Sequence, residues 1–232
     1  LDMLRLATMD RADLVAALSL MTDDYTAWIK EQSALIGSEF PEHTVSAESA
    51  MDRCAEINSR LQEGIAVLAD AGNEDALKAF RFANDAMAKQ RIQSIYALKR
   101  RRGDKDVTVD EIAKDPKNYS WRSFQLAFLL LSIPALANPT HNDRTDPAEA
   151  FADLLWFPTG GGKTEAYLGV AAFTMAIRRF QGDVGGYDAS RGLAVIMRYT
   201  LRLLTLQQFQ RATALMCAME VLRRQWNADG DL

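Results

Sequence analysis

The most definite chemical pattern in the sequence is Phe157-Pro158-Thr159-Gly160-Gly161-Gly162-Lys163-Thr164. Three successive glycines let several backbone N–H groups turn toward one anion, because no Cβ atom stands in the way. The charge of Lys163 suits the β and γ phosphates of a nucleotide, and the Thr164 hydroxyl suits a bridging magnesium ion. The pattern predicts a site for ATP and Mg²⁺, with Lys163 and Thr164 as catalytic residues and Thr164 as the metal ligand. The residues expected to line the nucleotide phosphates are Thr159, Gly160, Gly161, Gly162, Lys163, Thr164 and Glu165.

A loop of this kind needs a strand before it and a helix after it. Leu154-Leu155-Trp156 is a short apolar run, which we expect to be the strand. The helix is expected to begin near Glu165 and to place an apolar stripe on a sheet. That stripe consists of Tyr167, Val170, Phe173, Ile177 and Phe180. After a glycine-bearing loop at 181–191, the continuous apolar run 193–197 is typical of a parallel strand covered on both faces.

One position departs from the general phosphate-loop pattern, which has glycine where this chain has Phe157. The variant Pro-Thr-Gly-x-Gly-Lys-Thr, with a non-glycine residue before it, is similar to motif I of superfamily 2 helicases and translocases. The alternative is a glycine-rich turn that binds nothing. A Lys-Thr pair at a strand-to-helix junction is difficult to explain by packing, so we favour phosphate binding.

A second chemical group lies upstream, at Arg122-Ser123-Phe124-Gln125, where Ser120 is expected to cap a helix. It resembles the Arg-x-x-Gln element that precedes motif I in many superfamily 2 helicases. That resemblance implies that the Gln125 amide, which is both a donor and an acceptor, pairs with the adenine edge and that Arg122 belongs to the same cofactor site. The alternative is that Gln125 is an ordinary polar residue on a half-buried helix.

The third group follows the predicted strand at 193–197 and corresponds in position to motif Ia. Arg198 and Arg202 can neutralise nucleic-acid phosphates without reading the bases. Neutral hydrogen bonds are expected from Thr200, Thr205 and Gln208. The alternative is a helix cap followed by a charged helix face.

The first part of the chain has apolar residues at helical spacing over 10–36, 46–72 and 73–102, which predicts three mainly antiparallel helices. Ser46 is expected to cap the second helix and Asn73 the third. The tetrad Lys99-Arg100-Arg101-Arg102 either complements the dipole of a helix end or contacts a phosphate backbone. A polar stretch at 103–118 suits a boundary, so we predict a helical region at 1–118 and an ATP-binding region at 119–232.

Charge is distributed unevenly along the 232 residues, which have 27 basic and 31 acidic side chains and a net charge of −4. Residues 1–75 are strongly acidic, whereas the arginines of 191–224 form a basic stretch, so a nucleic-acid surface is expected toward the C-terminal end. The longest apolar run, 126–137, is too short to span a bilayer, so we expect no membrane segment. Cys54 and Cys217 are expected to be buried free thiols in a reducing cytoplasm.

Taken together, the stretches 120–127, 155–169 and 197–211 resemble the DrmA-type helicases of the bacterial DISARM anti-phage system. This resemblance implies an α/β fold, in which a helical region precedes the first part of a RecA-like P-loop domain with an incomplete parallel sheet. It also implies an ATP-driven motor that acts on DNA, single-stranded or at a junction, together with a protein partner subunit in a defence complex.

No Asp-Glu pair follows Thr164, although such a motor needs one to hold magnesium. We therefore expect this chain to be the N-terminal part of a longer protein and to bind ATP without hydrolysing it alone. Two alternatives remain open. The helices can be an interaction module whose conformation is set by nucleotide, or the loop can serve a nucleotide-binding protein that is not a helicase.

Overall fold

The computed structural model describes residues 1–38, 41–148, 152–158, 160–184, 186–189, 191–198 and 202–229, with only the backbone described at 187, 202–205 and 228–229. Helices account for 76% of the described residues. The α-helices are α1 (Met3–Thr8), α2 (Arg11–Leu35), α3 (Thr44–Ala69), α4 (Glu74–Arg101), α5 (Val109–Ala113), α6 (Ser123–Ala137), α7 (Asn142–Thr145), α8 (Lys163–Gln181) and α9 (Arg202–Asp229). Short 3-10 turns lie at Pro41–His43, Ala71–Asn73 and Pro116–Tyr119.

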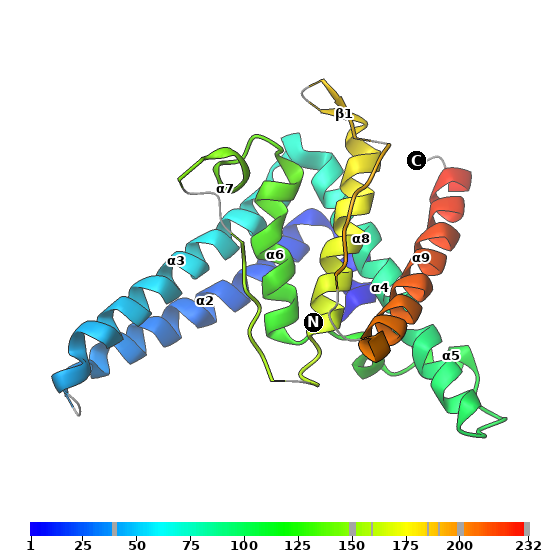
Figure 1. Cartoon of the computed structure of the whole chain (residues 1–232), viewed down its shortest axis with the longest axis horizontal. Coiled ribbons are helices and arrows are strands. Elements are labelled where there is room, and N and C mark those ends of the chain that lie inside the picture. Colours follow the sequence, from blue (N-terminus) through cyan, green and yellow to red (C-terminus); the bar gives the residue numbers. More distant parts are fainter. Residues whose placement is uncertain are drawn as a thin grey trace.

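Helix α4 is the centre of the fold. It packs against α1, α8 and α9, while α6 fills the space between α3 and α8 (Figure 1). Small side chains on α4 allow its neighbours to approach closely, because an alanine adds little width to a helix. The fully buried alanines of α4 are Ala79, Ala83, Ala86 and Ala88. The scaffold of the candidate site is therefore a helical layer built around α4.

Helices α2 and α3 form an antiparallel hairpin that projects from one side of the molecule (Figure 1). A buried Asn58 ties the two helices together, since its Nδ2 donates to the Thr26 hydroxyl at 2.7 Å and to the Thr22 carbonyl at 3.2 Å. At the same interface, burial and then a hydrogen bond with Cys54 raise the pKa of Tyr25 to about 12. The hairpin is held by this interface along its length, and α3 also packs against α6 of the central layer.

The predicted α/β fold class is wrong for this structure. The described residues contain an antiparallel ladder of β1 (Asp183–Val184) with β2 (Tyr187–Asp188) and an isolated antiparallel bridge between Asp2 and Ser120, but no parallel pair. The apolar runs expected to be strands belong to no strand and are largely exposed, with Leu154 at 84% and Ile196 at 79%. The parallel RecA-like sheet is therefore not seen.

The physical reason lies in what covers α8. Its apolar stripe packs on α4 and α6 instead of on a sheet, with Phe173 and Ile177 fully buried there. Helical periodicity shows that one face of a helix is buried, but it does not show whether a sheet or other helices bury it.

Several helix starts also differ from the prediction. Helix α3 begins at Thr44 rather than after Ser46, and α6 begins at Ser123 with Arg122, not Ser120, at its N-cap. Both cysteines are free, but Cys54 is only half-buried and Cys217 is exposed, so the expectation of buried thiols was wrong. The basic tetrad closes α4, where Arg100 Nη1 donates to the Lys105 carbonyl at 2.5 Å, as expected for a helix end.

The division at residue 118 stays a prediction. Helices from both sides of it share one hydrophobic core, because α3 and α4 pack against α6 and α8. Among the helices of the described ranges, none is long and apolar enough to cross a membrane.

Trp121 connects the core to the start of α6. Its indole Nε1 donates to the Oδ1 of Asn84 on α4 at 2.7 Å, and both residues are buried. A Cβ atom added at Gly169 of α8 would lie only 2.7 Å from the Trp121 ring. Because residue 169 is a glycine, the Trp121 indole can pack directly against the backbone of α8.

We expect Gly169→Ala to destabilise the fold by about 1–3 kcal/mol, because overpacking forces the indole or the helix to move. In a Trp121→Phe background the smaller ring leaves room, so the penalty of the same change should nearly vanish. Urea denaturation of the four proteins in this cycle measures the two penalties. Equal penalties in both backgrounds would show that the Gly169 contact is not what limits this site.

Candidate phosphate-binding site

The glycine loop has a backbone that only glycine adopts readily. Gly160 and Gly162 have φ values of 83° and 92°, and the Gly161 N–H donates to the Pro158 carbonyl at 3.1 Å to close a turn. Lys163 is the first residue of α8, which is 19 residues long. The loop therefore lies at the positive end of a long helix dipole, where anions are stabilised.

The start of α6 holds this loop through its carbonyl groups. Arg122 Nη1 donates to the Gly161 carbonyl and Gln125 Nε2 donates to the Gly162 carbonyl, each at 2.7 Å. In a planar trans peptide the C=O and the next N–H point in opposite directions. The N–H groups of Gly162 and Lys163 therefore point away from α6.

These N–H groups remain available. No acceptor in the described part of the chain takes a hydrogen bond from the backbone N–H of Gly162, Lys163 or Thr164, as is usual in the first turn of a helix. The Thr164 hydroxyl likewise has no partner among the described residues. On the open side, a Cβ added at Gly160 would meet nothing within 4 Å. The arrangement can accept an anion without moving the backbone.

Lys163 lies back against its own loop. Its Nζ donates to the carbonyls of Phe157 and, at 3.3 Å, of Pro158. The acceptors of these hydrogen bonds are neutral, whereas a phosphate would offer a charged acceptor and add the Coulomb attraction between two opposite charges. A phosphate bound at the start of α8 can therefore draw the ammonium away from the two carbonyls.

Glu165 was expected to line the nucleotide, but its carboxylate is occupied by two arginines. Its Oε1 accepts from Arg91 of α4 at 3.0 Å and from Arg211 of α9. Neither arginine was singled out from the sequence. A signal for Arg91 was present, because it interrupts an apolar stripe between Met87 and Ile95 at four-residue spacing.

Gln125 has a structural role that the sequence analysis missed. It is only 4% exposed, and its Oε1 accepts from the backbone N–H of Arg122 at 2.9 Å while its Nε2 holds Gly162. Next to it, the rings of Phe124 and Phe157 stack with centroids 4.0 Å apart. Adenine recognition by Gln125 stays a prediction, and it would have to use the remaining amide hydrogen and lone pair.

A magnesium ion finds one suitable protein ligand here, the Thr164 hydroxyl. The described residues contain no group of three or more His, Cys, Asp or Glu side chains that could hold a metal. The residues fit an ion that arrives with the phosphates and takes most of its oxygen ligands from them and from water, as magnesium commonly does.

The predicted nucleic-acid residues are only partly described. Arg198 is exposed and has no partner among the described residues. Gln208 is half-buried, and its Oε1 is shielded from solvent without a partner in the same part of the structure. Arg202 and Thr205 lie on α9 with undescribed side chains, and Thr159 and Thr200 lie outside the described residues.

The chain is similar in sequence to a protein of known family. No protein-family model matches the chain. It is 37% identical over 227 residues to the DISARM protein DrmA of Bacillus paralicheniformis, and the alignment covers 95% of this chain. The chain spans 19% of the length of that relative. The resemblance to DrmA is therefore confirmed, and it extends over the N-terminal helices as well as the glycine loop.

Proposed function

We propose that the loop at 160–164 binds the phosphates of ATP with Mg²⁺, and that this is the nucleotide site of an ATP-dependent DNA motor. One observation carries the proposal: the Arg122 and Gln125 side chains hold the loop carbonyls on one side, so that the N–H groups of Gly162 and Lys163 face the other, where no described residue accepts from them. Lys163 and Thr164 follow the loop directly as the first two residues of α8, at the positive end of its dipole.

Each residue has a distinct role in this site. The N–H groups of Gly162, Lys163 and Thr164 bind phosphate oxygens, and the Lys163 ammonium neutralises the charge at the β and γ positions. Thr164 contributes one hydroxyl ligand to the metal, and a bound magnesium ion supplies further neutralisation of the phosphate charge. Gln125 holds the Gly162 carbonyl, so that the following N–H faces the phosphates, and its remaining amide hydrogen and lone pair are available to the base.

The relative named DISARM protein DrmA supports a proposal for the wider function. We propose that the protein acts in anti-phage defence as a helicase or translocase on DNA, single-stranded or at a junction, together with a partner subunit. The basic stretch around the exposed Arg198 supports the DNA contact, and the free loop donors support the ATP requirement.

Lys163→Ala should weaken binding of ATP to the chain roughly 10- to 100-fold, since hydrogen bonds to charged groups contribute about 1.5–3 kcal/mol. The fold should be unaffected, because Lys163 bonds only to carbonyls of its own loop. Titration with a fluorescent ATP analogue measures the change. Lys89→Ala is the matched control, because that lysine pairs with Asp85 on the surface of α4. Equal affinities in all three proteins would contradict the proposed site.

For the DNA contact, replacing Arg198 and Arg202 by alanine should reduce affinity about equally for every DNA sequence. The slope of log affinity against log salt should become flatter by roughly one to two units, because fewer counterions are released. The matched control is Arg223→Ala/Arg224→Ala in the same basic stretch, where both arginines pair with Glu220. Parallel salt slopes in the complete gene product and the first double variant would remove this segment from the DNA path.

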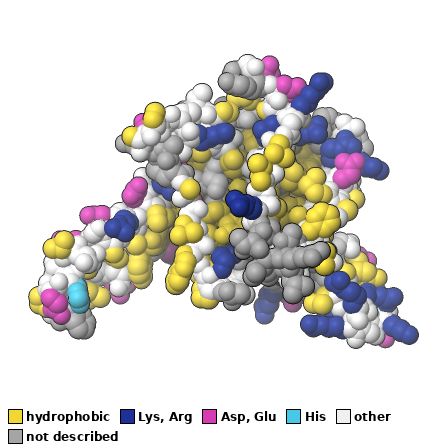
Figure 2. Space-filling view, in the orientation of Figure 1, with side chains coloured by type: hydrophobic (Ala, Val, Ile, Leu, Met, Phe, Trp, Pro, Cys, Tyr) yellow, Lys and Arg dark blue, Asp and Glu magenta, His cyan; other side chains and the backbone are white. Residues whose placement is uncertain are grey.

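A second candidate function is supported by the projecting hairpin. Trp28 and Leu35 are 43% and 58% exposed, and their seven-residue spacing places them on one side of α2. Hydrophobic side chains gather along the hairpin in Figure 2. Its surroundings are acidic, which disfavours nucleic acid and suits a protein contact. The helices can therefore be an interaction module for the partner subunit.

Trp28→Ser/Leu35→Ser should weaken co-purification of the complete gene product with its partner subunit and leave ATP binding unchanged. The two residues lie far along the hairpin from the glycine loop, so only the protein contact should respond. Val221→Ser, which changes a 51% exposed residue on α9, is the control. Retained co-purification in the hairpin variant would argue against an interaction module on this face.

A further inference from the structure

One charged cluster is explained neither by phosphate binding nor by DNA contact. The same carboxylate oxygen, Glu165 Oε1, accepts from Arg91 of α4 and from Arg211 of α9. The Glu165 side chain is only 10% exposed, and the two arginine side chains are 33% and 32% exposed. This carboxylate oxygen, in the first turn of α8, therefore connects α8 to both α4 and α9.

The cluster has a consequence for the electrostatics of the glycine loop. Glu165 Oε2 would lie 3.6 Å from a Cβ atom at Gly162, so the carboxylate is close to the loop. An unpaired carboxylate there would repel a phosphate, whereas one carboxylate between two guanidinium groups leaves a net charge of +1. The two arginines thus keep the local charge favourable for an anion.

The second consequence concerns α9. Arg211 lies nine residues after Arg202, the first residue of α9, which corresponds to about 14 Å along the helix. The two predicted DNA-contacting arginines, Arg198 and Arg202, lie just before α9 and at its first residue. Because a helix moves as a rigid unit over such a distance, a displacement of its N-terminal end reaches Arg211 and the carboxylate it holds.

We propose that the ion pair between Arg211 and Glu165 couples DNA contact at the start of α9 to phosphate binding at the start of α8. Arg91 is the fixed member of the cluster, because α4 is the central helix, and Arg211 is the member that moves with DNA. Both arginines are positioning residues that act through Glu165. The inference rests on the proposed function, since it requires that the two ligands bind.

The coupling is a measurable quantity. It equals the ratio of the ATP dissociation constants without and with single-stranded DNA, and linkage requires the same ratio for DNA without and with ATP. A non-hydrolysable ATP analogue and a fluorescent oligonucleotide are the probes, and the complete gene product is the sample. Ratios of about 5 to 150 are typical of coupled sites.

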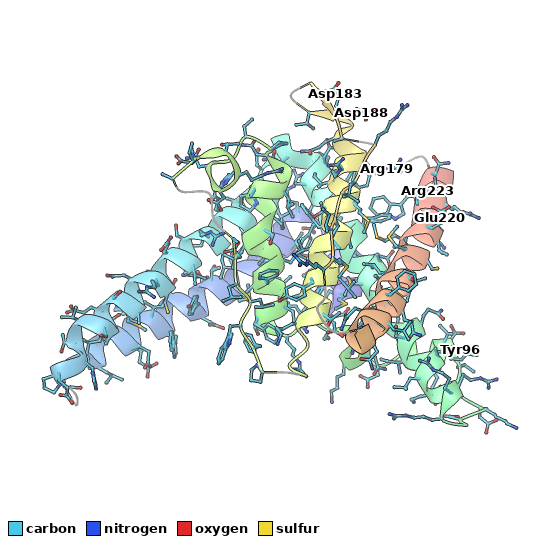
Figure 3. The ribbon with its side chains drawn as sticks, viewed as in Figure 1. Tyr96, Arg179, Asp183, Asp188, Glu220 and Arg223 are labelled. Atoms are coloured by element: carbon cyan, nitrogen blue, oxygen red, sulfur yellow. The ribbon has the colours of Figure 1, made fainter. Side chains whose placement is uncertain are left out.

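Arg211→Met should bring both ratios close to one. The affinity for DNA alone should be unchanged, and the affinity for ATP alone should fall a few-fold, because the net charge of the cluster drops from +1 to zero. Glu165 remains paired with Arg91 in this variant, so no buried carboxylate is left alone. Arg211→Lys should recover part of the coupling, because it keeps the cation. Arg223→Met is the matched control, because Arg223 pairs with Glu220 of its own helix in the C-terminal half of α9 (Figure 3). It should keep the ratio of the unchanged protein.

The outcomes separate the two proposals. Absence of ATP binding in the unchanged protein would reject the proposed function and the coupling with it. Binding of both ligands with a ratio of one, or an unaltered ratio in Arg211→Met, would reject only the coupling. Thermal denaturation checks that Arg211→Met is folded. If it is not, the coupling ratios of Arg211→Lys and the unchanged protein are compared instead, and equal ratios would overturn the inference.

Discussion

The candidate site depends on one constraint, the hold that the first turn of α6 has on the carbonyl groups of the glycine loop. Arg122 and Gln125 take up the Gly161 and Gly162 carbonyls, so the loop cannot turn its acceptors toward an anion. The planarity of the peptide bond then directs the N–H groups to the opposite side. A loop that rotated freely would present carbonyl oxygens to a phosphate as readily as N–H groups.

The rest of the fold fixes α6 relative to α8. Trp121, immediately before the Arg122 N-cap, is anchored on Asn84 of α4, and the bare Gly169 lets α8 approach the indole. Asn84 is fully buried and also donates to the Phe80 carbonyl at 2.8 Å, so its amide is satisfied in place. The two helices that flank the glycine loop, α6 and α8, are therefore both positioned by α4.

Charge is organised on the same plan. The hairpin of α2 and α3 lies in the acidic part of the chain, while the loop and α9 have arginines near them, and Figure 2 shows basic side chains around α8 and α9. Glu165 is the exception near the loop, and it is compensated by arginines from α4 and α9. The two arginines neutralise a carboxylate that would otherwise repel an anion at the loop, and their ion pairs connect α8 to α4 and α9.

Features that depend on neighbours within a few residues could be predicted from the residues alone. Consecutive glycines followed by Lys163 and Thr164 were sufficient to predict a glycine turn at a helix start, because positive φ values and the unbonded first N–H groups of a helix are properties of the segment itself. Phosphate binding at this turn stays a prediction. The helices α2, α3 and α4 were also predictable, since apolar spacing of three and four residues is a local signal. The DrmA resemblance was visible in the same motifs and was confirmed.

Which distant segments contact the residues of these motifs depends on packing and could not be predicted. The apolar stripe of α8 and the runs at 154–156 and 193–197 predicted a sheet, but α4 and α6 cover the helix and the two runs remain exposed. The Gly162 carbonyl that Gln125 Nε2 holds lies 37 residues away, and the arginines that pair with Glu165 lie 46 and 74 residues away. No local pattern shows which distant group meets a given side chain. Periodicity reports that a residue is buried, whereas packing alone determines the residue against which it is buried.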